Sequence, residues 1–222
     1  MSCGFDFARA RGRTTSGLVG MLLALGALCM PAHAFAQTAP EDSAPPSAPP
    51  AAAAADPAQA QAREAKARAY FGDDVLTDQD GAQHRFYTDL LSGNVVLINV
   101  VFTHCPSACP MMTERLKRVR RELGPGFGDR VMFLSISVDP ARDTPEALKA
   151  FAARHGVDEP GWRFLVADEV VLKRLLQRLG QWADKPDDHT TLLIAGNAQA
   201  ARWTKLRPDA PPEKIAAELQ RL

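Results

Sequence analysis

Cys105 and Cys109 are separated by three residues, and each is followed directly by a proline. On a regular helix, residues at this spacing have Cβ atoms about 5 to 6 Å apart. A disulfide needs about 3.5 to 4.5 Å between Cβ atoms, whereas a metal held by two bonds of about 2.3 Å bridges the wider gap. The spacing therefore favours metal binding. Oxidation to a disulfide stays open if the first helical turn loosens.

The donor types narrow the choice of metal. Structural zinc normally takes four protein ligands, and the other two cysteines, Cys3 and Cys29, lie in an N-terminal export segment. The chain has no Cys-x-x-Cys-His motif for covalent haem. Two thiolates and one imidazole in a trigonal site suit copper, and soft thiolates favour Cu(I) in particular. The alternative is a structural disulfide or a pair of inert buried thiols.

The cysteine pair lies where a strand is expected to pass into a helix. Residues 95–102 form a nearly continuous apolar run, which is typical of a strand buried on both faces. Apolar residues then recur at helical spacing from Met112 to Leu123. Reactive groups in open α/β sheets collect at the carboxyl ends of strands. The positive end of the helix dipole there favours thiolate over thiol.

Strands and helices alternate along the rest of the chain. We predict further strands at 131–138 and 162–167, a hairpin at 191–204 turning at 196–197, and helices after Thr144, after Asp168 and from Pro212 to the end. A turn signal at 78–81 predicts an N-terminal β-hairpin. The pattern predicts an α/β domain over residues 70–222, with a central sheet covered by helices on both faces.

The first 69 residues are expected to export and tether this domain. Residues 1–36 combine three arginines with an apolar run at 17–30 and small residues suited to signal peptidase. The run is shorter than the roughly 20 residues of a bilayer span, so a cleaved signal peptide is favoured and a retained membrane anchor is the alternative. Residues 37–69 are Ala/Pro-rich, which predicts a flexible linker. Ala-rich, charged residues at 61–69 could extend the domain as a frayed helix.

Composition and charge exclude some classes of function. The 222 residues are 46% hydrophobic and 23% charged, a globular composition, with 26 basic and 26 acidic residues. Without residues 1–36 the chain carries 23 basic and 25 acidic residues, a net charge of −2. A nearly neutral chain is a poor candidate for neutralising a nucleic-acid backbone, so we expect no nucleic-acid partner.

Three sequence blocks resemble one known family. Residues 103–110 (THCPSACP) are similar to the Thr-x-Cys-Pro-x-x-Cys-Pro motif of the Sco/SenC family. Residues 137–145 (SVDPARDTP) resemble its second block, and residues 188–190 (DHT) resemble its Asp-His-Ser block. The blocks occur in the family's order and span nearly all of residues 70–222. Thr190 stands where serine is common, and no Asp-containing turn follows Ile194.

The resemblance implies a thioredoxin-like fold, here a central mixed sheet flanked by helices with an N-terminal β-hairpin addition. It also implies an exported or membrane-tethered metallochaperone that delivers copper, as Cu(I) and also as Cu(II), to the Cu-A centre of cytochrome c oxidase during its assembly. The implied metal ligands are Cys105, Cys109 and His189. The expected location is the periplasm, with a tether to the inner membrane if the N-terminus is retained.

The expected partner is the Cu-A subunit of the oxidase, with a second copper chaperone or a thiol reductase as further candidates. The alternative function is a thiol–disulfide oxidoreductase that reduces cysteines of an oxidase subunit or another exported protein, with Cys105 and Cys109 as its redox pair. Thioredoxin-type reductases use Cys-x-x-Cys and a proline just before the facing strand. This chain has three residues between its cysteines and Thr190-Thr191 at the second position. Metal binding is therefore the first hypothesis.

Overall fold

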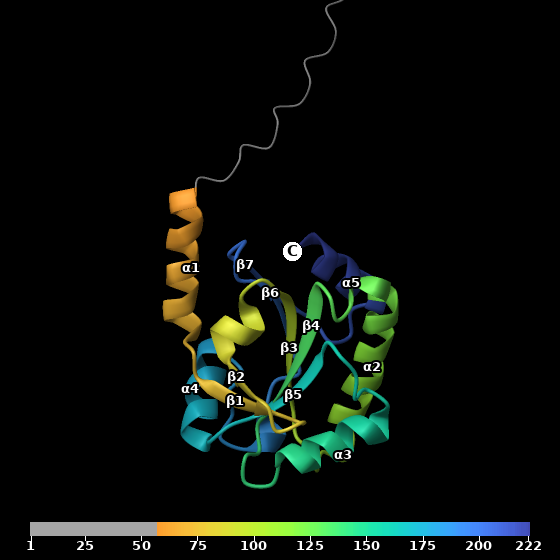
Figure 1. Cartoon of the computed structure of the whole chain (residues 1–222). Helices are drawn as coiled ribbons and strands as arrows, with labels where there is room; N and C mark the ends of the chain where they lie inside the picture. Colours follow the sequence, from red (N-terminus) through yellow and green to blue (C-terminus); the bar gives the residue numbers. More distant parts are fainter. Residues whose placement is uncertain (1–56) are drawn as a thin grey trace, which may run out of the picture. The chain divides into compact units, whose positions relative to one another are not determined.

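The computed structural model describes residues 57–222 (Figure 1). The expected export segment, residues 1–36, lies outside the described residues. Helix α1 (Pro57–Phe71) begins well before residue 70, so the part of the predicted linker from Pro57 onward is helical. Alanine, glutamine, lysine and arginine fill this stretch, and all are good helix formers. Within residues 57–222, no helix is both long and apolar enough to cross a membrane.

One seven-stranded mixed sheet forms the centre of the fold, in the order β2-β1-β5-β4-β3-β6-β7. Its strands are β1 (Val75–Asp78), β2 (Gln83–Arg85), β3 (Val95–Val101), β4 (Val131–Ser137), β5 (Trp162–Val166), β6 (Leu193–Asn197) and β7 (Arg202–Leu206). Strands β3, β4 and β5 are mutually parallel, and the other pairings are antiparallel. The predicted N-terminal hairpin is confirmed as β1–β2, which pairs onto the edge of β5.

Helices cover both faces of the sheet (Figure 1). The structure has α2 (Ala108–Leu123), α3 (Pro145–His155), α4 (Glu169–Leu179) and α5 (Pro212–Arg221), with short segments η1 (Phe86–Leu91), η2 (Gly124–Gly126) and η3 (Pro186–Asp188). Helices α2 and α3 lie on one side of the sheet, and α1 and α4 lie on the other (Figure 1). Every residue of β3 is buried, as its unbroken apolar sequence predicts. The strand that leads to the cysteine pair is therefore rigidly held.

Helix α4 begins directly after Asp168, as predicted, although the Asp168 side chain makes no capping hydrogen bond. One local prediction needs correction. Gly196 and Asn197 end strand β6 rather than forming the turn, and the hairpin turns after them, before β7. A side chain at Gly196 would collide with the Trp203 ring on the paired strand. This glycine therefore serves close packing inside the sheet and not the turn.

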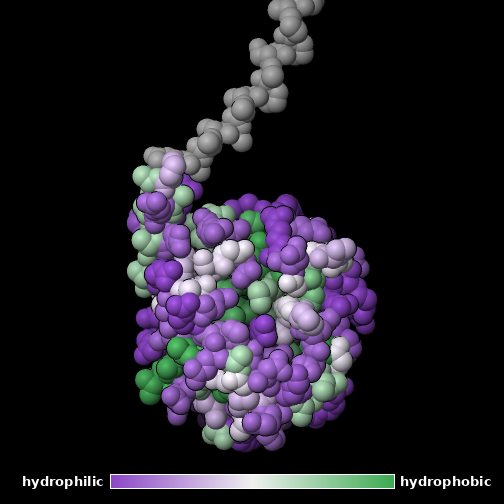
Figure 2. Space-filling model, in the orientation of Figure 1, coloured by the Kyte–Doolittle hydropathy of each residue, from purple (hydrophilic) through white to green (hydrophobic). Residues whose placement is uncertain are grey.

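The surface is mostly hydrophilic on the face seen in Figure 2, with small and separate hydrophobic areas. Four large hydrophobic side chains are exposed in the described part of the chain: Tyr70, Val75, Met111 and Val170. Scattered exposed hydrophobic residues are normal. Two of them are of interest because of where they lie: Met111 is two residues past Cys109, and Tyr70 lines a cavity described below.

Candidate metal centre

The cysteine segment connects the carboxyl end of β3 to the first turn of α2. The Cys105 N–H donates to the Phe102 carbonyl at 3.2 Å, which closes a turn directly after the strand. Helix α2 begins only at Ala108, so Cys109 is helical and Cys105 is not. The pair lies at the passage from strand to helix, as predicted, but the Cβ separation of a regular helix does not apply to it. Cys105 instead lies over the helix start, where the Cys109 N–H donates to its sulfur at 3.3 Å.

The two thiols are free and buried, and their environments differ. Burial raises the pKa of Cys105, but N–H groups of Cys109, Ser107 and Ala108 and the Cys109 thiol donate to its sulfur, and the pKa is lowered from 9.0. These amides are among the first N–H groups of α2, which have no partner within the helix. Burial raises the pKa of Cys109 to about 12, and the neighbouring Cys105 and Asp143 charges contribute to the rise.

This difference predicts the order in which the thiols react. We expect iodoacetamide in limiting amount at pH 7 to modify Cys105 well before Cys109. The thiolate is the nucleophile, and a lowered pKa gives Cys105 the larger thiolate fraction at neutral pH. Cys105 is also the more exposed of the two, at 9% against 3%. Peptide mass mapping after a short reaction measures the order, and equal labelling under native conditions would contradict it. Denatured protein, in which both pKa values return to normal, is the control.

His189 approaches the cysteine segment from a distant part of the chain. It follows η3 in the connection between α4 and β6, and its N–H donates to the Pro186 carbonyl at 3.4 Å. Its ring meets the Phe102 ring edge to face, with centroids 5.6 Å apart. Phe102 lies in the same β3–α2 connection as Cys105. The fold therefore brings the third sequence block to the first, as the resemblance implied.

A small cavity joins His189 to Cys109. Both side chains line it together with Met112, and its volume of about 10 Å³ suits one water-sized particle. Met112 carries a thioether, and soft sulfur ligands select Cu(I). The sequence shows Met112 only as part of the helical apolar repeat, so its place beside His189 was not predicted.

The structure does not gather all three implied ligands into one preformed group. Within residues 57–222, no three His, Cys, Asp or Glu side chains converge closely enough to hold a metal ion. Cys105 contacts Cys109, and Cys109 shares its cavity with His189, so Cys109 is the common member of both pairs. The donor set is soft, and the cavity has the right size. Completing a three-ligand site requires a movement of Cys105 or His189 toward Cys109.

Asp143 anchors the cysteine segment, a role that the sequence did not reveal. Its buried carboxylate accepts hydrogen bonds from the Thr103 N–H at 3.1 Å, the Thr103 hydroxyl at 2.5 Å and the Ser137 hydroxyl at 2.7 Å. Thr103 lies two residues before Cys105, and Ser137 ends β4. The carboxylate therefore ties the start of the cysteine segment to the neighbouring strand. The only sequence signal was that Asp143 belongs to the second family block.

Asp139 has a different role. Its contacts are those of a turn. Its carbonyl accepts from the N–H groups of Arg142 and Asp143, and its carboxylate pairs with Arg142 at 2.5 Å. The Ser137 hydroxyl accepts from its N–H at 3.0 Å. Asp139 thus shapes the loop that presents Asp143.

These features define a class of protein: a mixed α/β domain with a reactive cysteine pair after a central strand and a histidine at the facing connection. Comparison with known proteins identifies the family within this class. The SCO1/SenC family model matches residues 62–222, and the chain belongs to this family. The SCO1 protein homolog of Bacillus subtilis is 39% identical over 91 residues, which are 41% of this chain and 46% of that protein. The chain thus matches slightly under half the length of this relative.

Solved structures confirm the thioredoxin-like fold. ScoI of Bradyrhizobium japonicum, solved with copper bound, is 29% identical with a TM-score of 0.57, and the match covers 68% of this chain and 97% of that one. A SCO1/SenC family lipoprotein from Bacillus anthracis is 26% identical with a TM-score of 0.60, covering 68% of this chain and 94% of that one. The predicted family and fold are both confirmed.

Proposed function

We propose that this protein is an exported metallochaperone that binds copper at Cys105, Cys109 and His189 and delivers it to the Cu-A centre of cytochrome c oxidase during assembly. The observation that carries the proposal is the position of Cys109, which contacts Cys105 and shares a small cavity with His189. Family membership and the copper-bound ScoI structure support copper as the cargo. The cargo is Cu(I) first, because the donors are soft, with Cu(II) as a second state.

The unequal pKa values of the cysteines give copper binding an order. Metal ligands must be deprotonated, and Cys105 is the thiol whose pKa is lowered. Cys105 therefore captures the ion first. Cys109, whose pKa is about 12, keeps its proton until the positive ion arrives beside it. Binding of the ion then releases that proton and brings His189 in as the third ligand.

The difference between the two cysteine pKa values also favours release of the copper ion. An acceptor site that competes for copper leaves Cys109 free to take back a proton, which its pKa strongly favours at neutral pH. The site thus binds copper, but the bond between Cys109 and the copper ion is the one that reprotonation tends to break. An oxidised pair cannot bind, so a thiol reductase is a fitting partner, and a second copper chaperone is a fitting donor. We place these encounters in the periplasm, with residues 1–36 as signal or inner-membrane anchor.

Copper transfer tests the proposal directly. The full chain loaded with one Cu(I) is mixed with an apo Cu-A domain. A second equivalent of copper and an oxidant are supplied equally to all samples. The absorption bands of the Cu-A centre are then followed. We expect the wild type to load the domain. We expect His189→Ala, which removes a proposed ligand, to bind Cu(I) at least about 100-fold more weakly, because loss of an outer-shell partner alone costs about 10- to 100-fold, and to lose its copper to solution chelators before transfer. Failure of the wild type to load the domain would contradict delivery.

The alternative function, a thiol–disulfide oxidoreductase, is favoured by one observation. Cys105 has the lowered pKa of an attacking thiol, and Cys109 lies behind it as a resolving thiol. Thiol exchange needs no imidazole ligand, so His189→Ala separates the two functions. If this variant keeps both its copper affinity and a reductase turnover equal to that of the wild type, the order of the two hypotheses reverses.

A further inference from the structure

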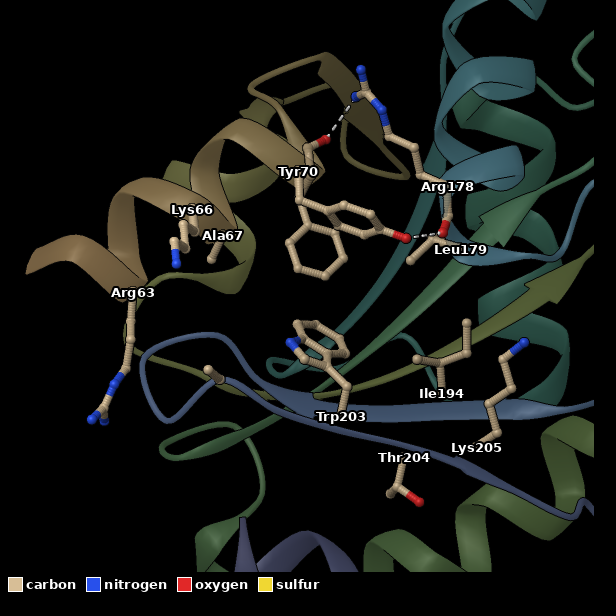
Figure 3. Close-up of a pocket in the computed structure, with 12 residues that line it drawn as sticks. Arg63, Lys66, Ala67, Tyr70, Arg178, Leu179, Ile194, Trp203, Thr204 and Lys205 are labelled. Atoms are coloured by element: carbon tan, nitrogen blue, oxygen red, sulfur yellow. Dashed lines mark hydrogen bonds between the residues drawn. The ribbon is translucent and has the colours of Figure 1, made fainter. Parts of the chain in front are cut away.

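A second cavity of about 500 Å³ lies beside helix α1 (Figure 3). Its walls come from α1, the end of α4, and the strands β6 and β7, and we call it the α1–β7 pocket. It shares no lining residue with the cavity of Cys109 and His189. Its volume falls within the range of pockets that hold small organic ligands.

Aromatic rings form the inside of this pocket. The Phe71 and Trp203 rings lie 4.6 Å apart between centroids, and the Tyr70 ring meets Phe71 edge to face at 4.9 Å. Tyr70 is 55% exposed, yet its hydroxyl donates to the Arg178 carbonyl at 2.8 Å. Phe71 contacts both other rings, and Figure 3 shows the Tyr70 hydroxyl directed at the end of α4. An exposed aromatic ring fixed in place is a preformed apolar surface for a ligand.

Four cations line the pocket beside the aromatic rings, and three of them have no acidic partner in the described part of the chain. Arg63 and Lys66 reach the pocket from α1, and Lys205 reaches it from β7 (Figure 3). Arg178 is bound to the Phe71 carbonyl at 3.0 Å and lies 3.6 Å from Asp74. In the described part of the chain, the other three cations have no carboxylate within ion-pair distance, and no acidic residue lines the pocket. Like charges around a low-dielectric cavity attract an anion.

We propose that the α1–β7 pocket binds a small amphipathic anion: a molecule with an aromatic or acyl body and one carboxylate, sulfonate or phosphate group. The body packs against the Tyr70, Phe71 and Trp203 rings, and Lys66 and Lys205 at the two sides of the pocket attract the charged head group. This site is additional to the copper site, and the proposal does not rest on the proposed copper function. The aromatic rings account for the body of the ligand, and the unpaired cations account for its charge.

A pair of matched probes tests both halves of the proposal on the full chain. Anilinonaphthalene sulfonate and N-phenyl-1-naphthylamine share an aromatic body, and only the first carries a sulfonate. We expect one sulfonate probe to bind per chain, and decanoate to displace it where decanol does not. We expect the charge-reversing variant Lys66→Glu/Lys205→Glu to weaken the sulfonate probe at least about tenfold, because two attractive charges become repulsive, and to leave the neutral probe unchanged.

The control variant Arg130→Glu/Lys214→Glu makes the same change of net charge at exposed cations outside the pocket. It should leave the binding of both probes unchanged. Equal weakening by the two double variants would show that only net charge matters and would overturn the proposal. The proposal would also be overturned if the wild type did not bind the sulfonate probe and its molar mass rose with chain concentration. If that rise were lost in Lys66→Glu/Lys205→Glu, the surface would be assigned to a second copy of the chain.

Discussion

Replacing Cys109 with serine is expected to abolish stoichiometric Cu(I) binding, and Cys105→Ser is expected to do the same. Loss of an outer-shell partner of a metal ligand typically weakens binding 10- to 100-fold, so loss of a ligand should weaken it by at least about 100-fold. Cys109 is the member that touches both Cys105 and the cavity of His189, so its loss separates the remaining donors. A competition titration of the full chain with a chromogenic Cu(I) chelator measures both affinities.

The two serine variants should differ in their dependence on pH. In the wild type, Cu(I) affinity should rise with pH through the neutral range, because the Cys109 proton, with a pKa of about 12, must leave on binding. Cys109→Ser lacks this proton, so its residual affinity should depend less steeply on pH, whereas Cys105→Ser should keep the steep dependence. Met111→Leu, which changes an exposed side chain two residues away, is the matched control and should bind as the wild type does. Full binding by both serine variants would remove the cysteines from the site.

The sequence predicted the scaffold well because its signals are local. An unbroken apolar run marked β3, and Thr144 followed by Pro145 marked the start of α3, where the Thr144 hydroxyl does accept from the Ala147 N–H. Errors arose where a distant residue decides the local structure. Gly196-Asn197 has the composition of a turn, but the Trp203 ring on the paired strand requires a glycine within the sheet.

The candidate site was predictable as a set of residues but not as an arrangement. Nothing in local spacing links His189 to Cys109, and only the family block suggested it. The sequence also could not show that Cys105 lies outside the helix, which is what gives its sulfur the amide hydrogen bonds that lower its pKa. The contribution of Asp143 was equally hidden, because its partner Thr103 is 40 residues away in the sequence.

Asp143 is the residue outside the implied ligand set whose replacement should have the largest effect. Asp143→Ala leaves the Thr103 N–H and the Thr103 and Ser137 hydroxyls without their buried acceptor. A buried donor left unsatisfied costs about 1 to 3 kcal/mol, so we expect the free energy of unfolding to fall by about 3 kcal/mol or more. Urea unfolding should show a midpoint lower by roughly 1 M or more. Asp139→Ala, which removes only the pair with the exposed Arg142, should cost about 1 kcal/mol or less.

The variant Asp143→Asn separates the positioning role from mere stability. It keeps the size of the side chain and one acceptor oxygen but removes the negative charge that helps to raise the pKa of Cys109. A lower pKa means more thiolate at a given pH, so Cys109 should be alkylated faster at pH 8 in folded Asp143→Asn than in the wild type, and the pH dependence of Cu(I) binding should shift to lower pH. Unchanged Cys109 reactivity in a folded variant would show that Asp143 only braces the loop. Because one carboxylate holds the cysteine segment and also adds to the effect of burial that keeps Cys109 protonated, the expected result would make Asp143 a determinant of how tightly copper is held and how readily it is released.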